Sequence, residues 1–93
     1  MMSSKDVCFE CARIYMGLTE YARAAAAFEM SNERCGEHHV THHNLGTCLF
    51  YLGEKERARR CFLRSLEMRA DYAEARNWLA KVEAELKGGG EDA

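Results

Sequence analysis

Residues 39–72, HVTHHNLGTCLFYLGEKERARRCFLRSLEMRADY, repeat the pattern of residues 5–38, KDVCFECARIYMGLTEYARAAAAFEMSNERCGEH, over the same 34 positions and without a gap. The two stretches agree at apolar, small and charged positions, namely Leu18 and Leu52, Glu20 and Glu54, Arg23 and Arg57, Ala24 and Ala58, Phe28 and Phe62, Ser31 and Ser65, and Glu33 and Glu67. A third, shorter copy begins at Ala73 and keeps Leu79 and Leu86 in step. Self-similarity at this period indicates a protein built of repeated helical units.

Each copy predicts a pair of helices, because apolar residues recur at i, i+3 and i+4 and the 93 residues contain no proline. We expect helices over residues 5–16, 20–33, 40–52, 55–69 and 72–87, with breaks at Gly17, Gly36 and Gly53 and with Thr19 as an N-cap. The fold class is therefore all-α with about five helices. Residues 88–93 lack large apolar side chains, and we expect them to form a flexible tail.

Composition is that of a single globular domain, with 47% hydrophobic and 30% charged residues. No apolar run is long enough to cross a membrane, and no secretory signal precedes the helical pattern. The odd number of cysteines, five, favours free thiols and a cytoplasmic location. The net charge of −2 argues against nucleic acid, so we expect the exposed stripe of Arg57, Arg60 and Arg64 to suit an acidic protein surface instead.

The second copy carries a recognisable motif: Asn44-Leu45-Gly46, then Gly53, Ala58, Phe62 and Ser65. This phrase resembles the tetratricopeptide repeat (TPR). The first copy departs from the pattern in having Cys11 at the leucine position and in lacking the turn glycine at its usual place, and the tryptophan-like position is held by Cys8, His42 and Arg76. The resemblance implies one TPR-like domain over residues 1–93, a right-handed superhelix of antiparallel helix hairpins with repeats at 5–38 and 39–72 and a capping helix at 73–87.

The resemblance also implies a function, that of a non-enzymatic scaffold or adaptor that binds a protein or peptide partner. In TPR proteins the first helix of each repeat lines a concave groove. The positions implied here are Phe9, Arg13, Met16, Val40, His43, Asn44, Thr47, Phe50, Tyr51, Asn77 and Lys81. One TPR subclass holds the C-terminal carboxylate of chaperones with two lysines, two asparagines and an arginine at set groove positions. Of these five, only Asn44 is present here, so we expect a different partner.

Zinc binding is the alternative hypothesis. Cys8 and Cys11 form a C-x2-C pair, and Cys35 and His38 form a C-x2-H pair, which together supply the ligand types of a tetrahedral site. The end of the second helix returns beside the start of the first in a helical hairpin. Buried cysteines in a helical core explain the same residues without metal, and we favour that interpretation.

Enzyme motifs are missing from the sequence, which contains neither a phosphate-binding glycine loop nor a nucleophile elbow. We expect no catalysis and no cofactor. Two complete repeats are close to the lower limit for a stable stack, because each unit buries its apolar face only against a neighbour. Self-association through an exposed repeat end is one way to supply that neighbour.

Overall fold

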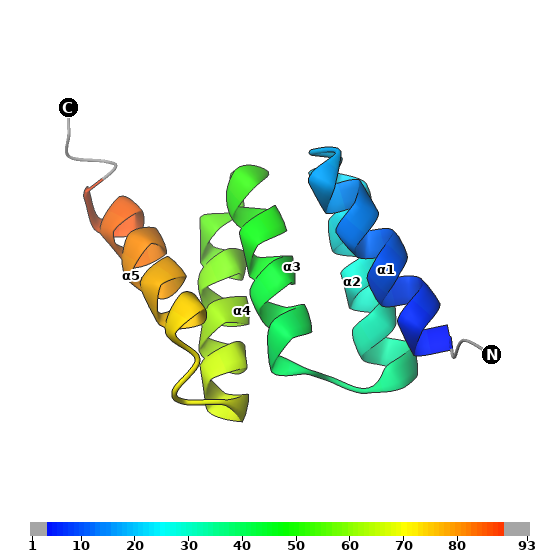
Figure 1. The fold of residues 1–93 in the computed structure, drawn as a ribbon. Helices are drawn as coiled ribbons and strands as arrows, with labels where there is room; N and C mark the ends of the chain where they lie inside the picture. Colours follow the sequence, from blue (N-terminus) through cyan, green and yellow to red (C-terminus); the bar gives the residue numbers. More distant parts are fainter. Residues whose placement is uncertain (1–3, 89–93) are drawn as a thin grey trace.

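The computed structural model describes residues 4–88 and contains five α-helices (Figure 1). They are α1 (Ser4–Gly17), α2 (Tyr21–Cys35), α3 (His39–Tyr51), α4 (Lys55–Met68) and α5 (Ala73–Gly88). The described part of the chain contains no strand, so the expected all-α fold is confirmed. Helix α5 extends through Gly88, and the remainder of the predicted flexible tail lies outside the described residues.

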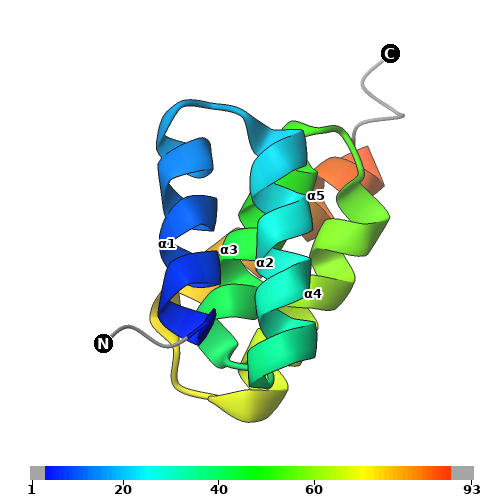
Figure 2. The same cartoon turned by 90° about the vertical axis from the view of Figure 1, so that its right-hand side faces the viewer.

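The helices pack in chain order, α1 on α2, α2 on α3, α3 on α4 and α4 on α5, while α3 also touches α5. Two hairpins and one further helix therefore form a stack that is longer than it is wide, 53 × 28 × 18 Å (Figure 1). Turned by 90°, the same stack shows α1 and α2 together at one end, in front of the other helices (Figure 2).

Phenylalanine fills the centre of each hairpin. Phe28 and Phe62 are both 0% exposed and lie 34 positions apart in the sequence. Phe9 meets Phe28 edge-on with ring centroids 5.7 Å apart, and His43 meets Phe62 in the same way at 5.7 Å. The two hairpins therefore repeat one packing arrangement, and full burial of each ring contributes about 1.5–3 kcal/mol by transfer alone.

Small residues make room for these rings. Ala12 and Gly46 occupy equivalent positions and are both buried, as are Ala24 and Ala58. A Cβ atom added to Gly46 would lie 2.9 Å from Cζ of Phe62, inside van der Waals contact. The close approach of α3 and α4 therefore depends on a glycine at this position.

The turns inside the two hairpins are also equivalent. The amide of Glu20 donates to the carbonyl of Tyr15 at 2.8 Å, and the amide of Glu54 donates to that of Leu49 at 2.9 Å. Gly53 adopts φ 87° in its turn, and Thr19 adopts φ 59° in the corresponding place. The prediction of Thr19 as an N-cap was wrong: its hydroxyl donates to the carbonyl of Leu18, and Glu20 precedes α2 without a side-chain cap.

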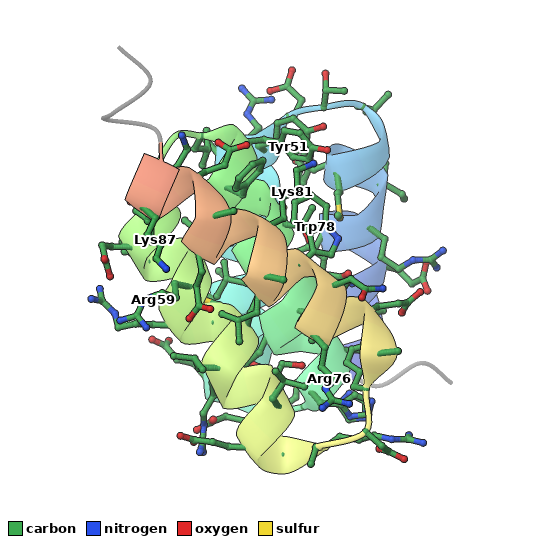
Figure 3. The ribbon with its side chains drawn as sticks, turned by 90° about the vertical axis from the view of Figure 1, so that its left-hand side faces the viewer. Tyr51, Arg59, Arg76, Trp78, Lys81 and Lys87 are labelled. Carbon is green, nitrogen blue, oxygen red and sulfur yellow. The ribbon has the colours of Figure 1, made fainter. Side chains whose placement is uncertain are left out.

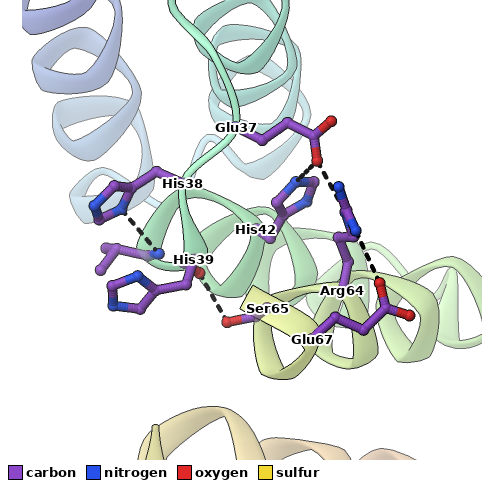
Figure 4. Close-up of polar contacts among 8 residues, drawn as sticks. Glu37, His38, His39, His42, Arg64, Ser65 and Glu67 are labelled. Carbon is purple, nitrogen blue, oxygen red and sulfur yellow. Dashed lines mark hydrogen bonds and ion pairs between the residues drawn. The ribbon is translucent and has the colours of Figure 1, made fainter. Parts of the chain in front are cut away.

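Polar contacts join the two hairpins at the loop between α2 and α3 (Figure 4). One carboxylate oxygen of Glu37 accepts from Nε of Arg64 at 2.9 Å and lies 3.0 Å from Nε2 of His42. The bond from Arg64 holds the pKa of the Glu37 carboxyl below its ordinary value, and His42 adds to this effect. The Ser65 hydroxyl donates to the carbonyl of His39 at 2.8 Å, which ties α4 to the start of α3.

Two of the three arginines in the α4 stripe form ion pairs inside the molecule. Arg64 binds Glu37, and Arg57 binds both Glu54 at 2.7 Å and Glu29 of α2 at 2.9 Å. These side chains are exposed, so each pair adds little to stability.

Replacing Thr19 by glycine is expected to stabilise the fold. A β-branched residue at positive φ carries strain of about 1–3 kcal/mol, which glycine would relieve. Glycine also loses more conformational entropy on folding, which offsets about 0.5–1 kcal/mol of that gain. We expect Thr19→Gly to raise the free energy of unfolding by about 1 kcal/mol in urea denaturation. The reciprocal change, Gly53→Thr, should lower it, and equal stability of all three proteins would contradict the assignment of strain.

Replacing Gly46 by alanine is expected to destabilise the fold, although alanine is the better helix former. The added methyl group meets the ring of Phe62, which is buried and cannot move aside. Overpacking costs about 1–3 kcal/mol and outweighs a propensity gain of about 1, so we expect a net loss of about 1–2 kcal/mol. The matched control is Gly17→Ala in α1, where nothing lies within 4 Å and the change should be neutral or stabilising.

Candidate functional site

Aromatic side chains gather where the end of α3 meets α5. Phe50 and Tyr51 of α3 both contact Trp78 of α5 edge-on, with centroid distances of 5.3 and 5.9 Å. Tyr21, at the start of α2, stacks on the other side of Tyr51 at 4.9 Å. We call Tyr21, Phe50, Tyr51, Trp78 and the neighbouring Lys81 the aromatic surface.

Lys81 holds its ammonium group against these rings. Its Nζ lies 5.0 Å from the centroid of Trp78 and 5.4 Å from that of Phe50, within the range of cation–π attraction. Figure 3 shows Tyr51, Trp78 and Lys81 grouped at one edge of α5, while Arg59 and Lys87 lie at the opposite edge. The aromatic surface therefore combines apolar rings with one positive charge.

The core positions this surface. The ring of Trp78 stacks on Phe62 at 5.7 Å with an interplanar angle of 11°, and Phe62 is itself held against Gly46. Tyr51 remains 52% exposed although it contacts three other rings. The outer rings are thus fixed from beneath and open to solvent above, which is a favourable arrangement for a binding surface.

A second group of side chains surrounds His43 at the other end of α3. His43 is half-buried between Phe62 and Tyr72, and its Nδ1 donates to Oδ1 of Asn44 at 3.2 Å. This bond leaves Nε2 as an acceptor, and it is buried without a hydrogen-bond partner in the described structure. Burial lowers the pKa of His43, so the ring resists protonation.

The structure distributes the residues predicted to line the groove over different environments. Phe50, Tyr51 and Lys81 come together in the aromatic surface, and His43 and Asn44 form the hydrogen-bonded pair described above. Phe9, Met16 and Val40 are half-buried, whereas Arg13 and Asn77 are exposed. Arg13 lies 3.3 Å from its helix neighbour Glu10.

Thr47 differs from the prediction of an accessible lining residue. Its side chain is only 5% exposed, and its hydroxyl donates to the carbonyl of His43 one turn earlier. Thr47 therefore offers a partner almost no surface. The physical reason is that α3 is the central helix of the stack, covered by neighbours on more sides than a two-faced amphipathic pattern assumes.

Two members of the aromatic surface, Tyr21 and Trp78, were not among the predicted residues. Trp78 occupies the position equivalent to Asn44 in the 34-residue alignment, and it is the only tryptophan of the chain. A large aromatic residue at a position where the previous repeat has a polar one was the available signal. Tyr21 begins the second helix of its repeat and carries no such signal, because its contact with Tyr51 exists only after stacking.

The zinc hypothesis is not supported. Among the described side chains, no three histidines, cysteines, aspartates or glutamates are placed to hold a metal ion. Cys11 is exposed on α1, and Nδ1 of His38 accepts from the amide of Val40 as the N-cap of α3. Cys8, Cys11, Cys35 and His38 are therefore not assembled into one site.

Buried thiols show no activation either. Burial raises the pKa of Cys48 and of Cys61 to about 11. Both side chains are therefore neutral thiols at physiological pH, whereas a cysteine nucleophile requires the thiolate.

The repeated hairpins and the surface they expose define a class of protein, that of helical repeat proteins. Residues 40–72, which form the second hairpin, match the model of the Tetratricopeptide repeat family. This match, the five helices in two equivalent hairpins and the terminal helix all fit a TPR-like repeat protein. No curated protein matches the sequence significantly.

Tetratricopeptide repeats generally act as protein-interaction modules and not as enzymes, and they bind protein partners. Within residues 4–88, every helix is too short or too polar to cross a membrane.

The depressed pKa of His43 predicts loss of stability in mild acid. The unfolded chain takes up a proton below the ordinary histidine value of 6.5, while the folded chain resists it, so the penalty is absent above this pH and grows as the pH falls below it. We expect the urea concentration at the midpoint of unfolding to decrease as the pH is lowered from 7.5 to 5.5, a range of about one unit on either side of that value.

His43→Phe should reduce this pH dependence, because phenylalanine does not titrate and the equivalent Phe9 makes the same edge-on contact in the first hairpin. The pKa of His39 is also lowered by burial, so part of the dependence should remain. An equal loss of midpoint in both proteins would contradict the role of His43.

Proposed function

We propose that this protein is a non-enzymatic scaffold that binds a partner polypeptide on the concave side of the stack, along α1, α3 and α5. The aromatic surface is the observation that carries the proposal. Tyr51 is a large side chain with half its area in water, and Phe50, Trp78 and Lys81 adjoin it. Aromatic residues of this kind are enriched in protein interfaces and dominate their binding energy.

The chemistry of the aromatic surface indicates what the partner presents. An apolar side chain would pack against the rings of Tyr51 and Phe50. Lys81 makes no ion pair with any described residue and retains its hydrogen-bonding capacity above the rings of Phe50 and Trp78. A carboxylate beside the apolar side chain would therefore complete the contact.

Rigidity supports the same proposal. Trp78 is stacked on the buried Phe62, and Tyr51 is held between Tyr21 and Trp78. Rings that are already fixed lose little conformational entropy on binding, so more of the contact energy appears as affinity.

Three of the other predicted residues, Arg13, Asn44 and Asn77, extend this surface in the proposal. Arg13 and Asn77 are exposed polar side chains on α1 and α5, and Asn44 lies on α3 between them in the repeat order. They would contact the backbone and polar side chains of an extended partner, while the aromatic surface anchors it.

The test is selection of binding peptides from a random peptide library displayed on phage, followed by titration of a selected peptide. Trp78 is the only tryptophan, so its fluorescence reports occupancy of the aromatic surface directly. We expect the selected peptides to combine apolar and acidic residues and to change Trp78 emission. Tyr51→Ala should weaken binding about tenfold, because truncating a central aromatic contact typically costs more than about 1 kcal/mol.

Lys81→Ala should weaken binding of the same peptide, and Lys87→Ala, at the opposite edge of α5, is the matched control that should leave it unchanged (Figure 3). Equal affinity of the parent, Tyr51→Ala and Lys81→Ala proteins would show that the partner binds elsewhere.

A further inference from the structure

The free end of the stack exposes apolar side chains of α1 and α2. Val7, Ile14 and Leu18 of α1 are 47%, 60% and 63% exposed, and Met30 of α2 is 42% exposed. Figure 2 looks onto these two helices, and no other described helix lies in front of them. We call the surface formed by Val7, Cys11, Ile14, Leu18, Arg23 and Met30 the end face.

A groove of about 460 Å³ runs between α1 and α2 within the end face. Six of the residues that line it are Cys8, Cys11, Tyr15, Arg23, Ala27 and Met30. Adding 34 to each number gives His42, Leu45, Leu49, Arg57, Cys61 and Arg64, and these six line a smaller groove of about 280 Å³ between α3 and α4. The molecule therefore contains the same groove twice, once at its free end and once inside the stack.

The inner groove has an occupant. Helix α2 packs against α3, and its Glu29 reaches into the lining, where Oε2 lies 2.9 Å from Nη2 of Arg57. Thr41 and Cys48, which lie on α3 next to the lining residues His42 and Leu49, are 3% and 0% exposed.

At the free end, no helix within residues 4–88 covers the equivalent positions. Val7 and Ile14, which correspond to Thr41 and Cys48, are about half-exposed or more. Arg23 corresponds to Arg57, yet it forms no ion pair with any described residue. The end face therefore presents apolar side chains and an arginine like those of the inner groove, but among the described residues no helix packs on it and no carboxylate pairs with the arginine.

We propose that the end face binds an amphipathic helix of a partner protein, which presents small apolar side chains to α1 and α2 and a glutamate to Arg23. We take the chemistry of the partner from α2, which packs at the inner groove. On its packed side, α2 has the small residue Ala25 and, one turn later, Glu29, which pairs with Arg57. This surface shares no residue with the aromatic surface.

A second copy of the chain is a poorer occupant. Its free terminal helix, α5, exposes Ala80, Glu83 and Ala84, but Glu83 already lies 3.9 Å from Arg59 of its own molecule. Lys87 lies beside Ala84 and Glu83 and would bring a positive charge towards Arg23. A partner helix whose glutamate has no ion pair of its own, and which has no lysine beside it, would avoid both the competing pair and the repulsion of Arg23.

The probe is a synthetic peptide of residues 20–36 of this chain, the α2 segment, with Cys35→Ser to prevent oxidation and a fluorescent label. It is titrated into the full chain by fluorescence anisotropy. We expect saturable binding that Ile14→Lys in the protein weakens at least tenfold. Ile14 is 60% exposed, so this change should leave the fold intact, which circular dichroism verifies. The matched control is Leu86→Lys on α5, which should have no effect.

The charge contact is tested by a double-mutant cycle. Arg23→Gln in the protein and Glu29→Gln in the peptide should each weaken binding about two- to fivefold, the range expected for one exposed ion pair, and the two losses should not add. Independent losses would overturn the assignment of Arg23.

Three other results would overturn the proposal. They are absence of saturable peptide binding, binding that Tyr51→Ala abolishes while Ile14→Lys does not, and sedimentation equilibrium showing self-association of the parent that Ile14→Lys removes. In the last case the end face is covered by a second copy.

Discussion

The ring of Phe62 is the contact on which most of the molecule depends. It lies against Gly46 on α3, meets His43 edge-on and stacks with Trp78 on α5, so one side chain joins three helices. Its equivalent in the first hairpin, Phe28, is packed edge-on against Phe9 and so joins α2 to α1. Because the ring has no room to shift, the spacing of α3 and α4 and the position of α5 are fixed together.

The polar contacts between hairpins act differently. Arg57 with Glu29, and Arg64 with Glu37, are exposed pairs whose individual contributions are small. Both pairs reach from the first hairpin, or the loop after it, to α4, whereas the hydrogen bond from Ser65 to the backbone of His39 joins α4 to α3 within the second hairpin. Arg23, which corresponds to Arg57 at the free end of the stack, forms no ion pair with any residue in the described part of the chain.

The aromatic surface follows from the stacking of the units. Tyr21, Tyr51 and Trp78 belong to three different helices, and they meet because α3 lies between α2 and α5. Its chemistry, apolar rings beside one lysine, suits a peptide that carries an apolar and an acidic residue. The end face suits a helix instead, so the proposed scaffold would hold two kinds of partner on two surfaces.

The 34-residue period determined the fold by itself, because a repeated pattern of apolar and small residues has one packing solution for every copy. Helix bounds were predicted to within about two residues, an ordinary uncertainty for helix ends. Only the tertiary structure decided which face each neighbour covers: it buried Thr47, brought Trp78 beside Tyr51, and left Ile14 exposed where its equivalent Cys48 is buried. Period is a property of the chain, whereas burial depends on whether another helix lies against it.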